Sequence, residues 1–446
     1  MLSIFIFSFA LLSFKLGNVT LHPWDEAWYA SISRNILRAG NWLELTFNGS
    51  NYWDHPPLGF WMQSVSFSVF GVSDFSARLP MAIAGALTIV VIYLIGKKLK
   101  SSYVGLAAGL ILLSSRWWLM RARSGNLDAL LVLTQAVVFY LVLTLKNKKG
   151  LQRLWFFYGV SFLSKSAIST TLFPLVAIGS YLFLKEDKDW KKNLMRSVGW
   201  FLLPLIPWYG FNTIKYGLPF LEQNVWVIGL RRMSGEGVSS ETISRTLLYL
   251  RSAVHRWYQP AILATGLSVF LVKRKKEILW VLGYLLLTTL PYFLSAKAEI
   301  WHMIPAMIPM ALLIPLVASE IGEKIFKGRK LQVLILMVFA TISIWSVKEY
   351  WNSVIDLPVT VSHEARLALE ASKSELPLYL RDISYMSTVI FYADKDITTV
   401  NWVMGEEIDE LPKPFQMIVR EFVLDGAGEY TEIARSGDTL LVEFSE

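Results

Sequence analysis

The chain has 446 residues, of which 54% are hydrophobic, 14% aromatic and only 17% charged. A soluble domain usually carries about 25% charged residues, so this composition excludes an ordinary soluble domain. The net charge of +8 does not indicate nucleic-acid binding, because the basic residues lie in short clusters between apolar runs, and the absence of cysteine excludes disulfide bonds.

The first apolar run, residues 1–20, predicts a retained membrane helix. A cleaved signal peptide is the alternative, but the run has no basic start and no A-x-A-like site before Asp25. Further charge-free runs, such as residues 81–96, recur up to about residue 350, and several reach the roughly 17 to 25 residues that a bilayer requires. The pattern predicts an α-helical polytopic membrane protein.

Basic clusters between these runs predict the topology. Loops rich in Lys and Arg are typically cytoplasmic, which requires an even number of crossings between one cluster and the next. The clusters lie at residues 97–100, 146–153, 185–196, 273–276 and 324–330. We predict eleven spans, near residues 1–20, 77–96, 101–118, 126–145, 151–164, 166–184, 197–214, 257–272, 278–296, 301–319 and 331–348. The amino terminus is then cytoplasmic and the carboxyl terminus lies outside the plasma membrane.

Residues 151–184 are open to two interpretations, because Lys165 interrupts the apolar run. One long helix would place the basic segment 185–196 outside. The positive-inside pattern therefore favours two helices that meet near Lys165.

The first outer segment begins with "HPWDEAWYASISRNILRAGN", residues 22–41. Pro23 suits a helix start and Gly40 a helix stop, and apolar residues repeat every four positions, so the segment predicts an amphipathic interfacial helix. Asp25 and Glu26 fall in its first turn, where acids also stabilise a helix without any further role. Adjacent helical residues point about 100° apart, so at most one of the two faces a substrate directly.

Two further acids lie beside structural signals. Asp54 and His55 precede Pro56 and Pro57 in "NYWDHPPLGFW", which predicts an extended segment but is also compatible with a solvated turn. Asp128 opens a predicted span, where it could simply cap the helix.

Charged residues outside the basic clusters fall at the predicted outer side or at outer helix ends. None lies at the middle of a span, where a transporter is expected to hold its coupling charges. The alternatives to an enzyme are a transporter or flippase of lipid-linked sugars, which no internal repeat supports, and a non-catalytic membrane scaffold, which only an activity assay excludes.

The ordered motifs resemble one enzyme family. Six motifs follow one another in an order that matches the predicted topology: "HPWDEAWYASISRNIL", "YWDHPPLGFW", "FSARLP", "RARSGNLDALL", "FYGVSFLSKSAIS" and "SAKAEIWHMIPAMIPMALL". The set resembles the ArnT-like and protein O-mannosyltransferase branch of the GT-C glycosyltransferases. The sequence departs from ArnT at His55, where ArnT has a lysine, so the resemblance implies the chemistry but leaves the aminoarabinose and lipid A specificity open.

The resemblance implies transfer of one sugar from a polyprenyl- or dolichyl-phosphate carrier to a lipid, glycan or protein acceptor on the outer face. It makes Asp25 the best candidate for the general base, with Glu26 supporting it and Asp54 and Asp128 as second choices. Candidate partners of the carrier phosphate and substrate are His55, Arg123, Lys165, Arg231, Arg232, Lys297 and His302. Interfacial anchoring is the alternative role for these cations. A divalent metal ion between the acids and His55 is an open alternative without a specific ligand spacing.

Two regions complete the predicted organisation. Residues 215–256 mix aromatic and charged residues and predict interfacial or lid structure. From residue 351 the runs become short and alternating, which predicts a small extracytoplasmic α/β domain over 351–446, beside a transmembrane domain over 1–350.

Overall fold

The computed structural model describes residues 1–231, 240–271, 276–293, 299–325, 329–355, 357–400, 403 and 405–445. These residues form two compact units. The first unit comprises Met1–Phe14, Trp53–Gly59 and Met81–Asp356, and the second comprises Lys15–Tyr52, Phe60–Pro80 and Leu357–Glu446. The predicted boundary at residue 350 stays a prediction, and each unit is considered by itself.

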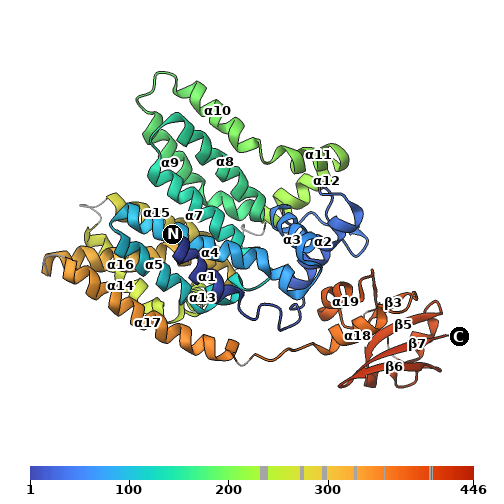
Figure 1. The fold of residues 1–446 in the computed structure, drawn as a ribbon. Coiled ribbons are helices and arrows are strands. Elements are labelled where there is room, and N and C mark those ends of the chain that lie inside the picture. The colour runs from blue at the N-terminus through green and yellow to red at the C-terminus, as the bar shows by residue number, and fades with distance from the viewer. Residues whose placement is uncertain are drawn as a thin grey trace. The chain divides into compact units, whose positions relative to one another are not determined.

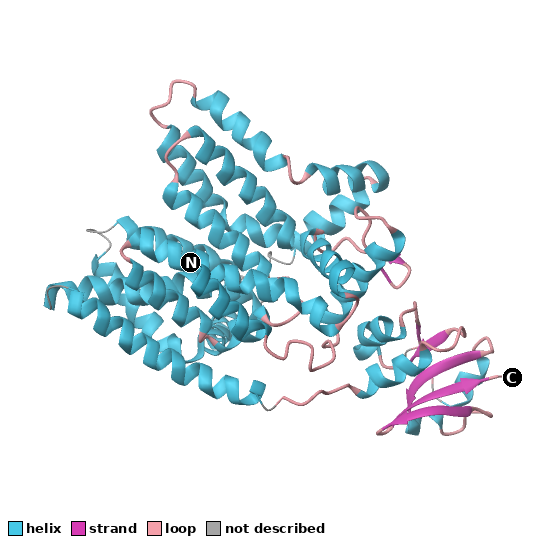
Figure 2. Cartoon of the chain, in the orientation of Figure 1, coloured by secondary structure: helices cyan, strands magenta, loops and turns pink. Residues whose placement is uncertain are grey.

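The first unit is built from helices (Figures 1 and 2). In chain order they are α1 (Leu2–Ser13), the larger part of α4 (Asp74–Leu99), α5 (Ser102–Leu113), α6 (Arg116–Ala122), α7 (Asp128–Thr144), α8 (Lys148–Lys165), η1 (Ser166–Leu172), α9 (Phe173–Leu184), α10 (Trp190–Leu202), η2 (Ile206–Gly210), α11 (Phe211–Tyr216), α12 (Leu218–Leu221), η3 (Glu222–Arg231), α13 (Ser240–Val254), η4 (His255–Trp257), α14 (Tyr258–Leu271), α15 (Lys276–Phe293), η5 (Ile300–Ala306), α16 (Met307–Ile325) and α17 (Arg329–Ile355). Helix α8 packs against α7 and α10, and α5 packs against α16 and α17.

Three helical segments within the described residues are long and apolar enough to cross a membrane. They are Asp74–Leu99, Ile300–Glu323 and Val333–Asn352. A fourth arises if α5 and α6, which meet at a bend of 75°, count as one broken span. Several other predicted spans correspond to shorter apolar helices, such as α1, α7 and α9. The count of eleven spans therefore stays a prediction.

Some helix boundaries differ from the predicted spans for local reasons. The predicted span 101–118 breaks at Ser114 and Ser115, whose hydroxyls donate to the Ile111 carbonyl. Such side-chain bonds to the preceding turn compete with the helix ladder. The predicted span 197–214 breaks after α10, where Pro204 and Pro207 cannot donate backbone hydrogen bonds. By contrast, α8 ends at Lys165 and α9 follows after η1, as the two-helix interpretation predicts.

The second unit contains α2 (Asp25–Ala39), most of α3 (Leu58–Phe70), the short hairpin strands β1 (Thr46–Phe47) and β2 (Ser50–Asn51), and the C-terminal elements. The predicted interfacial helix over residues 23–40 is therefore present as α2. Its burial is broader than the predicted apolar stripe, since the polar residues Glu26, Ser31, Ser33 and Arg34 are buried as well as Ala27, Ala30, Ile32 and Ile36.

The C-terminal elements form a five-stranded sheet with the order β4-β3-β5-β7-β6. Its strands are β3 (Leu378–Leu380), β4 (Thr398–Thr399), β5 (Phe415–Arg420), β6 (Thr431–Ser436) and β7 (Thr439–Phe444). Helices α18 (His363–Ala371) and α19 (Met386–Ala393) accompany the sheet, and α18 contacts β5, β6 and β7. This confirms the predicted small sheet with helices.

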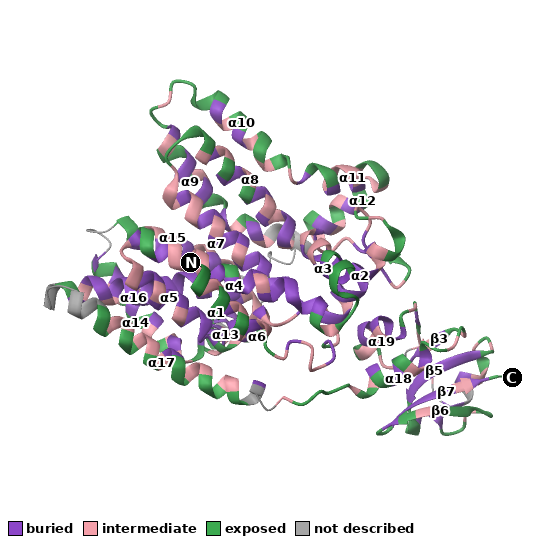
Figure 3. Ribbon diagram, in the orientation of Figure 1, coloured by how far each residue is buried: buried purple, intermediate pink, exposed green. Residues whose placement is uncertain are grey.

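The core of the sheet follows the two-residue period of its strands. Phe415 and Met417 of β5 share one buried cluster with Val442 and Phe444 of β7. The residues on the opposite face of both strands are also buried, so β5 and β7 are covered on both sides (Figure 3).

Candidate functional site

Helix α2 begins at Asp25, and its first two residues have different surroundings. Asp25 is partly buried, whereas Glu26 is only 3% exposed. Both carboxylate oxygens of Glu26 accept hydrogen bonds from Arg78, at 2.9 Å from Nε and 2.8 Å from Nη2. Glu26 Oε2 also accepts from the His22 backbone N–H at 2.9 Å. Glu26 therefore supports the helix start through a bidentate ion pair.

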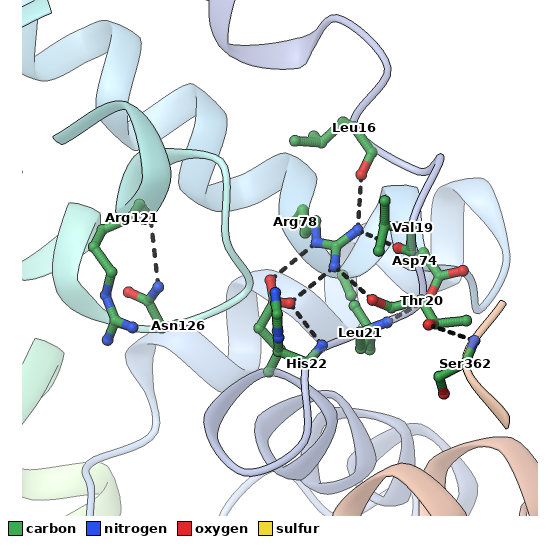
Figure 4. Close-up of polar contacts among 12 residues, drawn as sticks. Leu16, Val19, Thr20, Leu21, His22, Asp74, Arg78, Arg121, Asn126 and Ser362 are labelled. Carbon is green, nitrogen blue, oxygen red and sulfur yellow. Dashed lines mark hydrogen bonds and ion pairs between the residues drawn. The ribbon is translucent and has the colours of Figure 1, made fainter. Parts of the chain in front are cut away.

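Arg78 connects this ion pair to the turn that precedes α2 (Figure 4). Its Nη1 donates to the carbonyl oxygens of Leu16 and Val19 at 2.9 and 2.6 Å, and its Nη2 donates to the carbonyl oxygen of Thr20 at 3.1 Å. The planar guanidinium thus satisfies three backbone carbonyls and one carboxylate at once. Arg78 therefore helps to fix the path of residues 16–20.

The residue before Asp25 has an unusual backbone conformation. Trp24 has φ 70° and ψ −119°, in a region that non-glycine residues rarely adopt. Such a conformation costs about 1 to 3 kcal/mol and persists only where the surroundings hold it. The Trp24 N–H donates to Ser387 Oγ at 2.7 Å, and the Leu21 N–H donates to the Tyr392 hydroxyl at 2.7 Å. Both acceptors belong to α19.

The other end of α2 contacts the end of α19. Arg34 donates to the carbonyl oxygens of Phe391 and Ile390 at 2.6 and 3.2 Å and forms an ion pair with Asp394. Arg38 forms a second ion pair with the same carboxylate. Burial lowers the pKa of the Arg34 guanidinium to about 10, and the Asp394 carboxylate opposes this shift. Arg34 therefore keeps its charge at neutral pH and caps the last carbonyls of α19.

A cavity of about 570 Å³ lies beside these arginines, lined among others by Arg38, Asp394, Phe391 and Tyr392. Arg34 is nine residues beyond Asp25, which corresponds to about 14 Å along the helix axis. The cavity thus follows the later turns of α2, and two of its lining residues, Asp74 and Tyr392, also accept the Leu21 N–H before the start of the helix.

In the first unit, Asp128 is the centre of a buried charge cluster. It is 2% exposed and opens α7. Lys165 Nζ donates to Asp128 Oδ1 at 2.5 Å, and Arg121 Nε donates to Oδ2 at 2.6 Å. The structure therefore brings together two residues that the sequence predicted, Asp128 and Lys165, and adds Arg121.

Neighbouring side chains fix the position of this cluster. Asn126 Oδ1 accepts the Asp128 backbone N–H at 2.8 Å. Asn126 Nδ2 lies 3.5 Å from the Arg121 carbonyl oxygen (Figure 4). The Arg121 guanidinium also lies over the Trp301 ring, 5.6 Å from its centroid. The Asp128 carboxylate holds both cations, Lys165 and Arg121, by hydrogen bonds. Such an arrangement is suited to orient the two cations toward an anionic group.

His302 and Asp54 are placed by separate contacts. His302 stacks on Tyr292 with ring centroids 5.3 Å apart, and its Nδ1 accepts the Glu299 N–H at 3.0 Å. Asp54 Oδ1 accepts a hydrogen bond from Gln223 Nε2 at 2.8 Å. The adjacent Asn224 donates to the Trp53 carbonyl at 2.6 Å, so η3 fixes the segment that carries Asp54 and the partly buried His55.

Arg123 has a structural set of partners. Its Nη1 donates to the carbonyl oxygens of Leu11 and Leu12 at 3.1 and 3.0 Å, and its Nη2 donates to that of Phe14 at 2.7 Å. These carbonyls belong to the end of α1, which has no further turn to satisfy them. The geometry favours helix capping as the role of Arg123.

The remaining candidates are not all described. Arg232 and Lys297 lie outside the described residues, and the side chain of Arg231 does as well. Within the part of the chain that the structure describes, no group of three His, Asp or Glu side chains could hold a metal ion.

Sequence reasoning missed the importance of Arg78, Arg121 and Gln223. Arg78 lies in "FSARLP", which indicated only the order of the motifs, and Arg121 lies in "RARSGN", where the sequence predicted an interfacial anchor. A signal existed for Arg121, because a buried Asp requires a cation and Arg121 lies seven residues before Asp128. No sequence signal pairs Arg78 with Glu26, which is 52 residues away.

Comparison with solved structures identifies the class of fold. The chain matches ArnT from Cupriavidus metallidurans bound to undecaprenyl phosphate with a TM-score of 0.78 and 17% identity, over 99% of this chain and 97% of that chain. It also matches the oligosaccharyltransferase from Archaeoglobus fulgidus with a TM-score of 0.55 and 12% identity, over 90% of this chain and 63% of that chain. The chain therefore has the helical GT-C fold seen in ArnT.

Sequence comparisons agree with this fold. A family model described as dolichyl-phosphate-mannose-protein mannosyltransferase matches residues 54–210. An undecaprenyl phosphate-α-4-amino-4-deoxy-L-arabinose arabinosyl transferase from Pseudomonas aeruginosa is 26% identical over 67% of this chain and 56% of its own length. A second such transferase, from Proteus mirabilis, is 25% identical over 72% of this chain and 59% of its own length. The chain thus spans less than two thirds of these relatives, and the predicted resemblance to the ArnT-like and protein O-mannosyltransferase branch is confirmed.

Proposed function

We propose that this protein is an integral membrane glycosyltransferase that transfers one sugar from a polyprenyl- or dolichyl-phosphate carrier to an acceptor hydroxyl at the outer membrane face. The observation that carries the proposal is the match of 99% of the chain to the ArnT fold, in a structure that holds undecaprenyl phosphate. The arabinosyl transferase relatives, whose names specify an undecaprenyl-phosphate-linked sugar, support the same class of donor.

The proposed reaction breaks the bond between the anomeric carbon and the carrier phosphate oxygen. The acceptor oxygen forms the new bond to the anomeric carbon, its proton passes to a carboxylate, and the carrier leaves as the polyprenyl phosphate. Asp25 is the proposed base, because carboxylates serve as bases in comparable sugar chemistry and its partner Glu26 is already occupied by Arg78.

The leaving phosphate requires cations. Within the described residues, Lys165 uses one of its three ammonium donors on Asp128, so two remain for phosphate oxygens. Arg121 offers a guanidinium from the same cluster. Asp128 is proposed to position these two cations rather than to take the proton, since its oxygens already accept hydrogen bonds from both.

Residues beside Asp54 are proposed to bind the sugar or the acceptor. Gln223 fixes the Asp54 carboxylate, and His55 precedes the two prolines that keep this segment extended. Because His55 stands where ArnT has a lysine, the transferred sugar is proposed to be a pentose or hexose other than aminoarabinose. The acceptor class, whether lipid, glycan or protein, is left to experiment.

Transfer by the purified protein tests this proposal. Full-length protein in sealed proteoliposomes is incubated with polyprenyl phosphates that carry radiolabelled mannose, glucose, galactose or arabinose, together with envelope lipids, glycans and proteins. We expect the radiolabel of one sugar to move from its polyprenyl phosphate to one of the added acceptors. Movement of intact carrier across the bilayer, without bond cleavage for any sugar, would contradict the proposal and support a flippase.

A further inference from the structure

The segment just before Asp25 is held by the C-terminal part of the chain. Trp24 has a positive φ of 70° although it is not glycine, and its N–H donates to the hydroxyl of Ser387 on α19 at 2.7 Å. Ser387 is only 3% exposed, so this contact is shielded from water. Water therefore cannot readily replace the Ser387 hydroxyl as the partner of this N–H.

Other contacts from the same region hold the same turn. The Tyr392 hydroxyl, also on α19, accepts the Leu21 N–H at 2.7 Å. The Thr20 N–H donates to the Thr360 carbonyl at 3.1 Å. Within the second unit, backbone N–H groups of residues 20–24 therefore donate hydrogen bonds to three acceptors that lie more than 300 residues later in the chain.

The position of Trp24 gives its contact a specific consequence. Trp24 is the N-cap of α2, so its φ and ψ set the direction in which the helix begins, and Asp25 is the first helical residue. Strained backbone that is held from outside commonly occurs where a side chain must be presented in one orientation. If the Trp24 N–H loses its acceptor, the turn can relax toward an ordinary conformation and rotate Asp25 with it.

We propose that Ser387 is a positioning residue, which fixes the strained Trp24 turn and thereby the orientation of the Asp25 carboxylate toward the acceptor hydroxyl. The inference rests on the proposed function, in which Asp25 is the base. It also gives the C-terminal domain a role in the reaction, through one hydroxyl of α19.

The test compares two buried hydroxyls on the same helix. Ser387→Ala removes the acceptor of the Trp24 N–H, whereas Thr388→Val removes a hydroxyl that has no hydrogen-bond partner among the described residues and is 1% exposed. Because a misplacement of about 1 Å can cost about 100-fold in rate, we expect Ser387→Ala to lower kcat by about 10- to 100-fold, with KM for the carrier within about threefold. Thr388→Val should keep both constants.

A second variant separates positioning from general stability. Glycine adopts the Trp24 conformation without steric cost, so in a Trp24→Gly background the effect of Ser387→Ala on kcat should shrink to less than about threefold. Hydrogen exchange of residues 21–26 should be faster in Ser387→Ala than in Thr388→Val. An equal loss of kcat in both backgrounds, or a lower Tm with unchanged kcat, would overturn the positioning role.

The outcomes also distinguish this inference from the proposed function. A wild-type protein that transfers no sugar from any carrier would contradict the proposed function, and the positioning role with it. An active wild type whose kcat and hydrogen exchange are the same in Ser387→Ala would contradict the positioning role alone.

Discussion

Glu26 and Arg78 form a buried ion pair whose two members have little access to water, with side chains 3% and 7% exposed. Removing charges from water is costly, and this cost is met here by two hydrogen bonds between the partners and three from Arg78 to backbone carbonyls. Loss of the carboxylate would leave the Arg78 guanidinium buried without its counter-ion. The pair is therefore expected to matter for folding rather than for chemistry.

Replacing Glu26 by Gln should lower the stability of the folded protein by about 3 to 5 kcal/mol, because one partner of a buried pair is lost. Thermal unfolding in detergent, monitored by circular dichroism, checks this expectation. Glu186→Gln is the matched control, since the Glu186 side chain is 88% exposed and its ion pair with Lys185 is 3.7 Å long. A Glu26→Gln protein as stable as the control, but inactive, would instead make Glu26 a participant in the reaction.

The acidic pair also shows what the sequence can predict at the residue scale. Helical geometry alone indicates that at most one of Asp25 and Glu26 faces a substrate, and the structure turns Glu26 toward Arg78. The sequence could not indicate which of the two acids faces the substrate, because Arg78, the partner of Glu26, lies 52 residues away in the chain. The positive φ of Trp24 is equally invisible in the sequence, since it depends on contacts with α19.

At the scale of elements, the junction of α8 and η1 places Lys165 against the start of α7. Replacing Lys165 by Met should raise KM for the carrier or lower kcat, with a loss of about 10- to 100-fold in kcat/KM, because a charge-assisted hydrogen bond to phosphate contributes about 1.5 to 3 kcal/mol. Asp128 keeps Arg121 as its partner, so the fold should persist.

Steady-state kinetics with the active carrier checks the Lys165 prediction. Lys148→Met is the control, because Lys148 lies at the opposite end of α8, is 56% exposed and forms an ion pair with Asp187 at 3.3 Å. Equal kcat/KM for the two variants would assign Lys165 to the support of Asp128 alone.

Element boundaries follow from the sequence only where local signals are strong. Gly40 correctly predicts the end of α2, and Lys165 correctly predicts the break between α8 and η1. The bend between α5 and α6 was missed, because Ser114 and Ser115 are compatible with a helix until their hydroxyls bond to the preceding turn. The sequence did not distinguish helix α19 from the neighbouring strands, since the apolar residues of α19 also fit a short buried strand.

At the scale of the whole molecule, the basic clusters predict the topology in the membrane. A reporter fused after Lys149 should be cytoplasmic, and one fused at residue 360 should be outside, because an odd number of spans separates the two positions. Alkaline phosphatase and green fluorescent protein fusions check both positions. A cytoplasmic signal at residue 360 would remove one span and place the C-terminal domain on the wrong side for the proposed reaction.

The most direct test of the central claim compares the rates of sugar transfer by purified wild-type protein and by Asp25→Asn, with the carrier that the wild type uses. If the chain is a glycosyltransferase with Asp25 as its base, the wild type transfers the sugar, and Asp25→Asn is slower by about 10² to 10⁴ although it binds the carrier and unfolds at the same temperature. A rate for Asp25→Asn equal to that of the wild type would contradict this account of the reaction.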